Sequence, residues 1–263
     1  MKYNMFLKEK PFYAIKDVIK DIELGLNDDK RRKIKIGDTI EFTLNDSDEK
    51  VGVVVLDLYH YDSFENVYKE FDKVRLGYRE DENSSYKDME QYYSCDDIKE
   101  HGVVAIKIML IERVTPAILT DYKICPTCFN KENNSVLYGS NEKTLFYEDN
   151  LIECFFVGNP RSEGHVAISS RKHYKDMMDI GDELCEYVFV FAKKLMNIIK
   201  KVYESESVYL CTMCDGPMNH FHLQLIPRYK TEKRGSTNFV KERKEYVFNK
   251  EKFDRVKELL NEH

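Results

Sequence analysis

The sequence predicts an α+β protein with two domains, at residues 1–114 and 115–263. Three observations support this prediction. Short segments of alternating apolar and polar residues are separated by turn signals, which is typical of strands. One long stretch, residues 182–203, carries its apolar residues on a single helical stripe. All cysteines except Cys95, and four of the seven histidines, lie between residues 125 and 222, so the recognisable chemistry is concentrated in the second domain.

Composition excludes several classes of protein. The chain has 263 residues, and its 41 basic and 47 acidic residues give a net charge of −6, which argues against a general nucleic-acid coat protein. Low glycine and proline counts argue against low-complexity chains, and a hydrophobic share of 42% argues against disorder. No apolar run is long enough to span a membrane, and the first residues lack the apolar stretch of a signal peptide. We therefore expect a cytoplasmic protein.

The first half reads as a helix followed by strands. Phe12, Ile15, Ile19 and Ile22 fall near one helical face, which predicts a helix over residues 11–22. Strands are expected at residues 39–44, 51–58 and 103–111, with a turn at 45–48, a short helix opened by Ser63, and a polar loop over 78–88. The basic run at residues 30–35 is either a contact for a few phosphates of a nucleotide or RNA, or a solvated loop on an acidic domain.

This succession resembles the ASCH domain, a small β-barrel of the PUA-like class. The resemblance covers about residues 8–112 and rests on the segments KPFYAIK, IELGLNDDKRRKIKIGDTIEF, YHYDSFENVY and HGVVAIKI. It implies binding of RNA or modified nucleosides at a Gly-Lys-Lys-Thr-Ile-Glu-x-Arg-like segment, in which Lys20 and Glu23 match, whereas Val18, Asp21 and Gly25 depart. Some members hydrolyse an acetylated cytidine with a Lys and a Thr three residues on. Because Glu23 stands at that second position, we do not expect this activity.

The second half contains a hairpin, a strand, a helix and a histidine-rich strand, in that order. Residues 145–156 predict two strands around an Asp149-Asn150 turn, and residues 164–173 predict a strand that leads into a loop. The helix over 182–203 follows. A strand over 208–211 precedes the histidine-rich segment 219–228, and a final helix over 248–260 covers one of the two domains.

Residues 219–228 are the most informative part of the sequence. In a strand, His220, His222 and Gln224 line one face, while Phe221, Leu223 and Leu225 line the other and enter the core. Two imidazoles and a carboxamide are costly to bury without partners, so this face indicates a polar site. The alternative is an exposed edge strand with chance histidines, which fits the surrounding apolar residues poorly.

The second half resembles the histidine-triad (HIT) superfamily from about Cys125 to Tyr229. CPTC, FYEDN, GHVAISSRKH and HFHLQLIPR stand in family order. The family motif is His-x-His-x-His, and Gln224 at its third position is typical of the branch that resembles galactose-1-phosphate uridylyltransferase and diadenosine polyphosphate phosphorylase. The resemblance implies a HIT-like antiparallel sheet with helices. It also implies a nucleotidyltransferase, phosphorylase or hydrolase that acts on a nucleotide, a nucleotide sugar or a dinucleoside polyphosphate.

The same resemblance implies roles for single residues. His222 would attack the α-phosphorus and form a covalent nucleotidyl-histidine. Gln224 cannot titrate but can donate a hydrogen bond to a phosphate oxygen, which favours an intermediate that waits for an acceptor. His165 matches a histidine near the phosphate, or is a half-buried strand residue. The phosphate-binding zone of the family falls at Asp215, Gly216 and Asn219.

Cysteine spacing indicates a metal site. An odd number of cysteines in a cytosolic chain does not suggest a disulfide framework, and there are two Cys-x-x-Cys pairs, at 125/128 and 211/214. Zinc takes four cysteine or histidine ligands. The HIT resemblance implies a structural zinc held by Cys125, Cys128, His173 and His220. The alternatives are an all-cysteine site that includes Cys211 and Cys214, and no metal, with CPTC a simple turn.

Three functions remain open from the sequence. The first is a nucleotide-acting enzyme that works through His222. The second is a non-catalytic nucleotide- or RNA-binding protein, in which the zinc-stabilised second domain is a scaffold. In the third, the first domain delivers a nucleotide-bearing substrate to the second. Because many HIT-like domains pair through sheets or helices, a homodimer is a further expectation.

Overall fold

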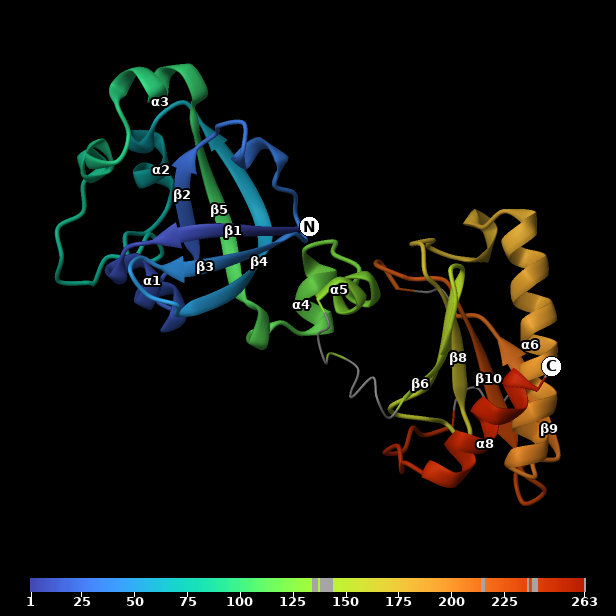
Figure 1. Ribbon diagram of the computed structural model, residues 1–263. Coiled ribbons are helices and arrows are strands. Elements are labelled where there is room, and N and C mark those ends of the chain that lie inside the picture. Colours follow the sequence, from blue (N-terminus) through green and yellow to red (C-terminus); the bar gives the residue numbers. More distant parts are fainter. Residues whose placement is uncertain (134–136, 138–143, 214–215, 236, 238–240, 263) are drawn as a thin grey trace. The chain divides into compact units, whose positions relative to one another are not determined.

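The computed structural model describes residues 1–133, 137, 144–213, 216–235, 237 and 241–262, and the chain forms two compact units, Met1–Ile124 and Cys125–His263 (Figure 1). The division falls later than the expected boundary after residue 114, because helix α4 (Pro116–Asp121) is attached to the first unit. Lys107 Nζ donates to the Tyr122 hydroxyl just beyond this helix, and Ile124 lies beside Gly37. No helix in the described ranges is long and apolar enough to cross a membrane.

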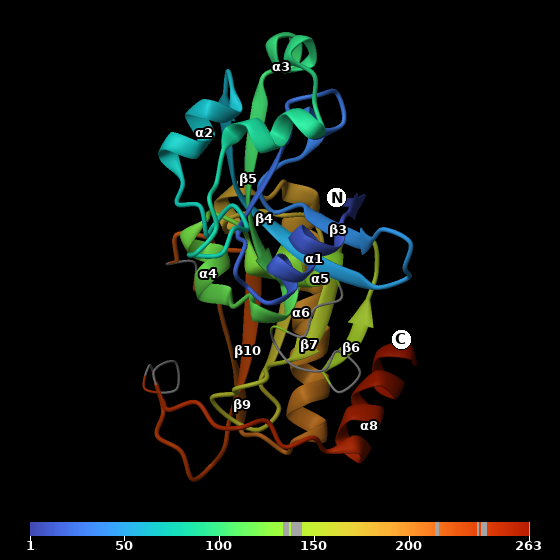
Figure 2. The ribbon, with the colours of Figure 1, turned by 90° about the vertical axis from the view of Figure 1, so that its left-hand side faces the viewer.

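The first unit is built on one curled five-stranded sheet, a half-barrel (Figures 1 and 2). The strand order is β1-β3-β4-β5-β2, so β1 and β2 form the two edges and the barrel is open. β1 runs parallel to β3, and the other neighbours are antiparallel. The strands are β1 (Lys2–Leu7), β2 (Ile22–Leu26), β3 (Thr39–Leu44), β4 (Lys50–Tyr61) and β5 (Val103–Leu110), with helices α1 (Glu9–Lys16), α2 (Phe64–Glu70) and α3 (Cys95–His101).

Several predicted elements of the first unit are confirmed. β3 has the predicted bounds, and β4 and β5 contain or nearly match their predicted spans. Ser63 caps α2 by accepting a hydrogen bond from the Asn66 amide at 3.4 Å. The predicted loop over 78–88 ends in a short 3-10 turn, Tyr86–Gln91. The edge strands β1 and β2 and the helix α3 were not predicted.

The helix predicted over residues 11–22 was wrong in its second half. α1 ends at Lys16, and Val18 adopts a left-handed φ of 62°, which reverses the chain. Ile22 then belongs to β2 and to a different hydrophobic cluster from Phe12, while Ile19 is exposed. The helical spacing therefore combined residues of two separate elements.

The second unit is a five-stranded antiparallel sheet in the order β6-β7-β8-β10-β9, with α6 and α8 packed together beside it (Figures 1 and 2). Apolar residues at helical spacing on α6, such as Val188, Leu195 and Ile199, are buried in the same core as Leu223 and Leu225. This confirms the predicted hairpin, long helix and final helix, which covers the second unit. The elements are α5 (Pro126–Asn133), β6 (Leu145–Glu148), β7 (Ile152–Phe156), β8 (Val166–Ser170), α6 (Asp182–Val202), β9 (Ser207–Cys211), β10 (His222–Arg228) and α8 (Lys250–Asn261).

The histidine-rich strand begins later than predicted. β10 starts at His222, which pairs with Ser169 of β8, and His220 precedes the strand. Phe221, Leu223 and Leu225 are buried in the core as predicted. However, His220 does not share a strand face with His222, because the pleat that would impose the alternation starts only after it.

Candidate active site and metal cluster

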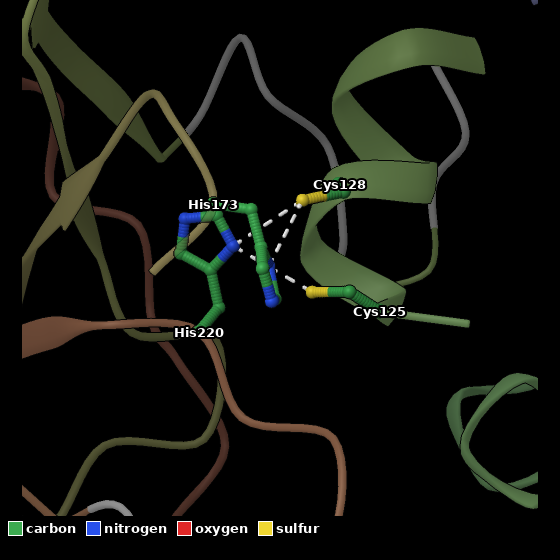
Figure 3. Close-up of side chains that lie close together, drawn as sticks. All are labelled: Cys125, Cys128, His173 and His220. Atoms are coloured by element: carbon green, nitrogen blue, oxygen red, sulfur yellow. Dashed lines mark hydrogen bonds between the residues drawn. The ribbon is translucent and has the colours of Figure 1, made fainter. Parts of the chain in front are cut away.

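Four side chains of types that can bind a metal converge where β8 ends and β10 begins (Figure 3). Cys125 and Cys128 lie at the start of α5, His173 follows β8, and His220 precedes β10. The Sγ of Cys128 lies 3.4 Å from Nδ1 of both His173 and His220, and the Sγ of Cys125 lies 3.6 Å from Nδ1 of His220. All four ligand atoms lie within 4.8 Å of one another.

The local fold explains why the two sulfurs converge. Residues three apart at the start of a helix lie on the same face, and the Phe129 amide donates to the Cys125 carbonyl at 3.0 Å in the first turn of α5. The helix is docked by buried Phe129 and by Lys131. Lys131 Nζ donates to the Ser170 carbonyl at 2.8 Å and pairs with Glu153 at 3.0 Å, which ties α5 to β8 and β7.

Hydrogen bonding fixes the tautomer of His220. Its Nε2 lies 2.7 Å from the carbonyl oxygen of Ser170, so Nε2 carries the proton and donates. Nδ1 then presents a lone pair to the two sulfurs. The Cys128 thiol beside it holds the pKa of the Cys125 thiol well below its usual range, which favours the thiolate. A lone pair and a thiolate that face each other are an arrangement suited to a cation.

Three sulfur–nitrogen distances in the cluster are close to those around a tetrahedral zinc ion. With Zn–S near 2.3 Å and Zn–N near 2.05 Å, neighbouring sulfur and nitrogen ligands of a tetrahedron are about 3.6 Å apart. The three sulfur–nitrogen distances of 3.4, 3.4 and 3.6 Å match this spacing. The Ser170 carbonyl accepts a hydrogen bond from His220 Nε2, and histidines that bind zinc commonly donate their other ring N–H to such a carbonyl.

A second set of polar side chains, which we call the reactive row, consists of His222, Gln224 and His165. The Nδ1 of His222 donates to the His220 carbonyl at 2.8 Å, so its Nε2 carries a lone pair. The Gln224 amide nitrogen lies 3.2 Å from that Nε2 and donates to it. The Gln224 oxygen in turn accepts from His165 Nε2 at 3.1 Å, and His165 Nδ1 accepts from the Arg161 amide at 3.1 Å. Every tautomer in the row is thereby defined.

Burial keeps both imidazoles of the reactive row neutral. Desolvation lowers the pKa of His222 and, with the charge of Arg243, lowers the pKa of His165 to about 3. His165 and Gln224 are buried, whereas His222 is partly exposed. His222 is therefore the member of the row that presents a neutral, accessible nitrogen lone pair to a ligand.

A family model for the HIT domain matches residues 139–233. The second unit carries a HIT domain. Its curated relatives include an uncharacterized HIT-like protein of Methanocaldococcus jannaschii, 28% identical over 99 residues, which are 36% of this chain and 76% of the relative. An uncharacterized HIT-like protein of Borreliella burgdorferi is 29% identical over 100 residues, 34% of this chain and 72% of the relative. A solved structure described as a Zn-bound histidine triad family protein, from Mycobacterium smegmatis, is 14% identical with a TM-score of 0.41, and the match covers 52% of this chain and 94% of that protein.

Other residues expected to serve the HIT domain are placed differently. Cys211 is not part of the cluster found among the described residues, and it pairs with Gln224 across the β9/β10 ladder. Asn219 donates to the Lys175 carbonyl at 2.9 Å, which holds the loop before β10. Gly216 has open space where a side chain would begin, so packing does not require glycine there. Cys214 and Asp215 lie outside the described residues.

In the first unit, Lys20 and Glu23 lie together in a buried position. Lys20 Nζ donates to the carbonyls of Ile22 at 2.6 Å and Leu76 at 3.0 Å, and lies 3.4 Å from Glu23 Oε2. That carboxylate oxygen is buried and has no hydrogen-bond partner among the described residues.

The nearby basic run is partly neutralised, because Arg31 pairs with Asp28 at 2.7 Å and Arg32 with Asp29 at 3.5 Å. The charge that this run could offer to a phosphate is reduced by these two pairs.

Two contributors to the site were not found from the sequence. The Ser170 carbonyl orients His220, and any residue type could supply it, so no sequence signal exists. Arg161 supplies the amide that orients His165. The sequence hints at this role only by placing Arg161 directly before the strand predicted over residues 164–173.

Proposed function

We propose that the HIT domain is a nucleotidyl-transferring enzyme in which Nε2 of His222 attacks the α-phosphorus of a nucleotide. The observation that carries this proposal is the hydrogen bond from His222 Nδ1 to the His220 carbonyl, which places the lone pair of the ring on Nε2. A substrate would displace the Gln224 amide that donates to this nitrogen in the free protein. The lowered pKa of His222 keeps that lone pair unprotonated near neutral pH. Because HIT proteins are a nucleotide-binding family, a nucleotide is the expected substrate.

The bond changes balance without an external acid or base. The Nε2–phosphorus bond forms, the bond from phosphorus to the bridging oxygen of the leaving phosphate breaks, and the leaving group takes that electron pair. The imidazole then carries a phosphorus on Nε2 and keeps its proton on Nδ1, where the His220 carbonyl still accepts it. An acceptor oxygen attacks the phosphorus in the second half-reaction and returns the lone pair to Nε2.

Gln224 favours transfer over simple hydrolysis in this proposal. Its amide donates to His222 Nε2 in the free protein, and the same N–H can turn to a phosphate oxygen once Nε2 is bonded to phosphorus. An amide cannot remove a proton from water. An acceptor that is already an anion, such as inorganic phosphate or a sugar phosphate, is therefore a better second substrate than water.

We further propose that Cys125, Cys128, His173 and His220 hold a structural zinc ion. Bound zinc would supply cross-linking between α5 and the segments that flank β8 and β10. Four protein ligands leave no open position, so the phosphorus chemistry belongs to the reactive row. His220 connects the two functions, since its side chain would bind the metal while its carbonyl orients His222.

Trapping of the covalent intermediate tests this function. The full-length protein is incubated with a panel of α-labelled nucleotides, and its intact mass is measured after alkaline quenching, because a phosphoramidate is stable in alkali and labile in acid. We expect one nucleotidyl group per chain in the wild type and in His60→Ala, where an exposed histidine of the first unit is removed. The adduct should be absent in His222→Ala. An adduct of the same mass in His222→Ala would contradict the assignment.

For the first unit we propose nucleoside or RNA binding of the ASCH kind at Lys20 and Glu23. The support is the buried Glu23 oxygen without a hydrogen-bond partner among the described residues, next to a lysine whose ammonium is already enclosed by carbonyls. Fluorescence anisotropy with labelled oligoribonucleotides and nucleosides should show binding that Glu23→Gln weakens and the exposed control Glu112→Gln leaves unchanged. Equal binding by wild type and Glu23→Gln would contradict this role.

A further inference from the structure

Two arginines beside the reactive row have no anionic partner. Arg161 and Arg243 form no ion pair with any residue in the described ranges, although other basic residues close by are paired. Arg228 on β10 lies 2.6 Å from Glu206, and Lys241 lies 2.7 Å from Glu232. The side-chain Nε of Arg161 is also buried without a hydrogen-bond partner among the described residues. A buried guanidinium nitrogen without an acceptor is costly, so it indicates a missing ligand.

Backbone pairing brings these arginines together. The segment around Lys244 returns along residues 158–161, with hydrogen bonds from the Lys244 amide to the Pro160 carbonyl at 2.9 Å and from the Tyr246 amide to the Gly158 carbonyl at 3.1 Å. Each arginine uses one terminal nitrogen on the opposite segment. Arg161 Nη1 donates to the Lys241 carbonyl at 2.8 Å, and Arg243 Nη1 donates to the Asn159 carbonyl at 2.9 Å. No further hydrogen-bond acceptor for either guanidinium group is found in the part of the chain that the structure describes.

The charges of both arginines act on the reactive row. Burial and the charges of Arg243 and Arg161 lower the pKa of His165, whose Nδ1 accepts from the Arg161 amide at 3.1 Å. The two arginines repel each other as well, since partial desolvation and the charge of Arg161 lower the pKa of Arg243. Two like charges held close together without a counter-ion raise the electrostatic free energy of the site. An anion bound between them would turn this repulsion into a net attraction.

The proposed nucleotidyl transfer requires positive charge near the leaving phosphate, which the two arginines would supply. When the phosphorus–oxygen bond breaks, negative charge develops on the leaving phosphate. The Gln224 amide can donate a hydrogen bond but does not ionise, and His165 is neutral and buried. The row therefore contains no acid that could protonate the leaving group. Fixed positive charge beside the breaking bond performs the same stabilisation without a proton.

We propose that Arg161 and Arg243 form a subsite for the phosphate group that is not transferred. This subsite would hold the leaving phosphate in the first half-reaction and the accepting phosphate in the second; in this use the inference rests on the proposed function. The ligand class is a phosphate dianion, as in inorganic phosphate, pyrophosphate or a phosphomonoester. Guanidinium groups bind such oxygens with two parallel N–H donors.

Titration calorimetry of the full-length protein with pyrophosphate and with inorganic phosphate tests the subsite without catalysis. Because charged hydrogen bonds contribute roughly 1.5–3 kcal/mol, the Kd for pyrophosphate should rise roughly 10- to 100-fold in Arg161→Gln and in Arg243→Gln. Arg255→Gln removes the same charge from the exposed face of α8 and should leave the Kd unchanged.

The outcomes separate this inference from the proposed function. If His222 accepts a nucleotide but Arg161→Gln and Arg243→Gln bind pyrophosphate as tightly as the wild type, the subsite is refuted and the function stands. If no nucleotide is transferred but both arginines are needed for pyrophosphate binding, the anion site stands and the function fails. If the glutamine variants do not fold, as judged by circular dichroism, Arg243→Lys replaces them. The lysine keeps the charge but lacks the two parallel N–H donors, so the Kd for pyrophosphate should still rise in Arg243→Lys. A Kd equal to that of the wild type would refute the subsite. No binding of either anion by the wild type also overturns it.

Discussion

The Nδ1 atom of His222 lies 2.8 Å from the backbone carbonyl oxygen of His220, and this hydrogen bond joins the metal cluster to the reactive row. The side chain of His220 faces Cys125 and Cys128, while its carbonyl selects the tautomer of His222. One residue thus contributes its side chain to one site and its backbone to the other. Disturbing the metal cluster should therefore affect the nucleophile, although no cluster ligand belongs to the reactive row.

Cys125→Ser should lose the metal and destabilise the second unit. Removing a thiolate ligand opens the tetrahedron, and loss of a structural metal is expected to cost on the order of 4 kcal/mol of unfolding free energy or more. Metal analysis and chemical denaturation measure the two effects, with Cys95→Ser as the control, because Cys95 is exposed in the first unit. Unchanged zinc in Cys125→Ser together with loss of zinc in Cys211→Ser would favour the all-cysteine alternative.

His222→Ala should reduce nucleotidyl transfer on the order of 10⁴-fold or more, as expected for loss of a nucleophile. No other member of the reactive row can replace it, because His165 is buried whereas His222 is partly exposed. Steady-state rates for the nucleotide that labels the wild type provide the measurement. A variant that keeps more than a tenth of the wild-type rate would exclude a covalent route through His222.

Gln224→His should shift the reaction from transfer towards hydrolysis. The substitution places a titratable group beside His222 Nε2, where the amide now donates at 3.2 Å, and an imidazole can remove a proton from an attacking water. The nucleotidylated protein is isolated and chased with buffer or with phosphate, and released products are quantified. Equal hydrolysis by wild type and Gln224→His would leave the nucleophile intact and remove the argument for a transferase.

Acid should destabilise the protein partly through His165. Its folded-state pKa of about 3 lies below the ordinary value of 6.5, so the unfolded chain takes up a proton that the folded chain does not. This contribution to stability is complete above about pH 6.5 and is lost as the pH falls towards 3, with a slope of up to about 1.4 kcal/mol per pH unit.

Urea denaturation at pH 7, 6, 5 and 4 should show this dependence in the wild type. His165→Gln should give a shallower curve by up to that slope. All other ionisable groups are the same in both proteins, so their contributions cancel in the comparison. Parallel curves for the two proteins would show that His165 is accessible to protons in the folded state.

Much of the second unit could be predicted from the sequence because its patterns are local. The alternation of Phe221, Leu223 and Leu225 with polar residues fixes which face of β10 enters the core, and the long apolar stripe defines α6. Cys125 and Cys128 are also separated by less than one helical turn, so their convergence follows from α5 alone.

Features that depend on long-range placement could not be predicted. Spacing cannot show that Ile22 belongs to β2 after the reversal at Val18, since Ile22 matches a helical pattern equally well. The approach of the segments that carry Arg161 and Arg243 depends on backbone hydrogen bonds between distant parts of the chain, and charged residues make up 33% of the sequence. The separation of His220 from the face of His222 depends on where β8 stops pairing with β10.

The hydrogen bond between His165 and Gln224 also determines which end of the Gln224 amide dipole faces an incoming anion. A carboxamide has a negative oxygen end and a positive N–H end, and a free glutamine side chain can rotate to present either. His165 Nε2–H holds the oxygen at 3.1 Å, so the N–H end points to His222 and to any phosphate bound there. A buried side chain that lies behind Gln224 therefore sets whether the site attracts or repels negative charge, and an acceptor-only residue at position 165 would allow the dipole to reverse.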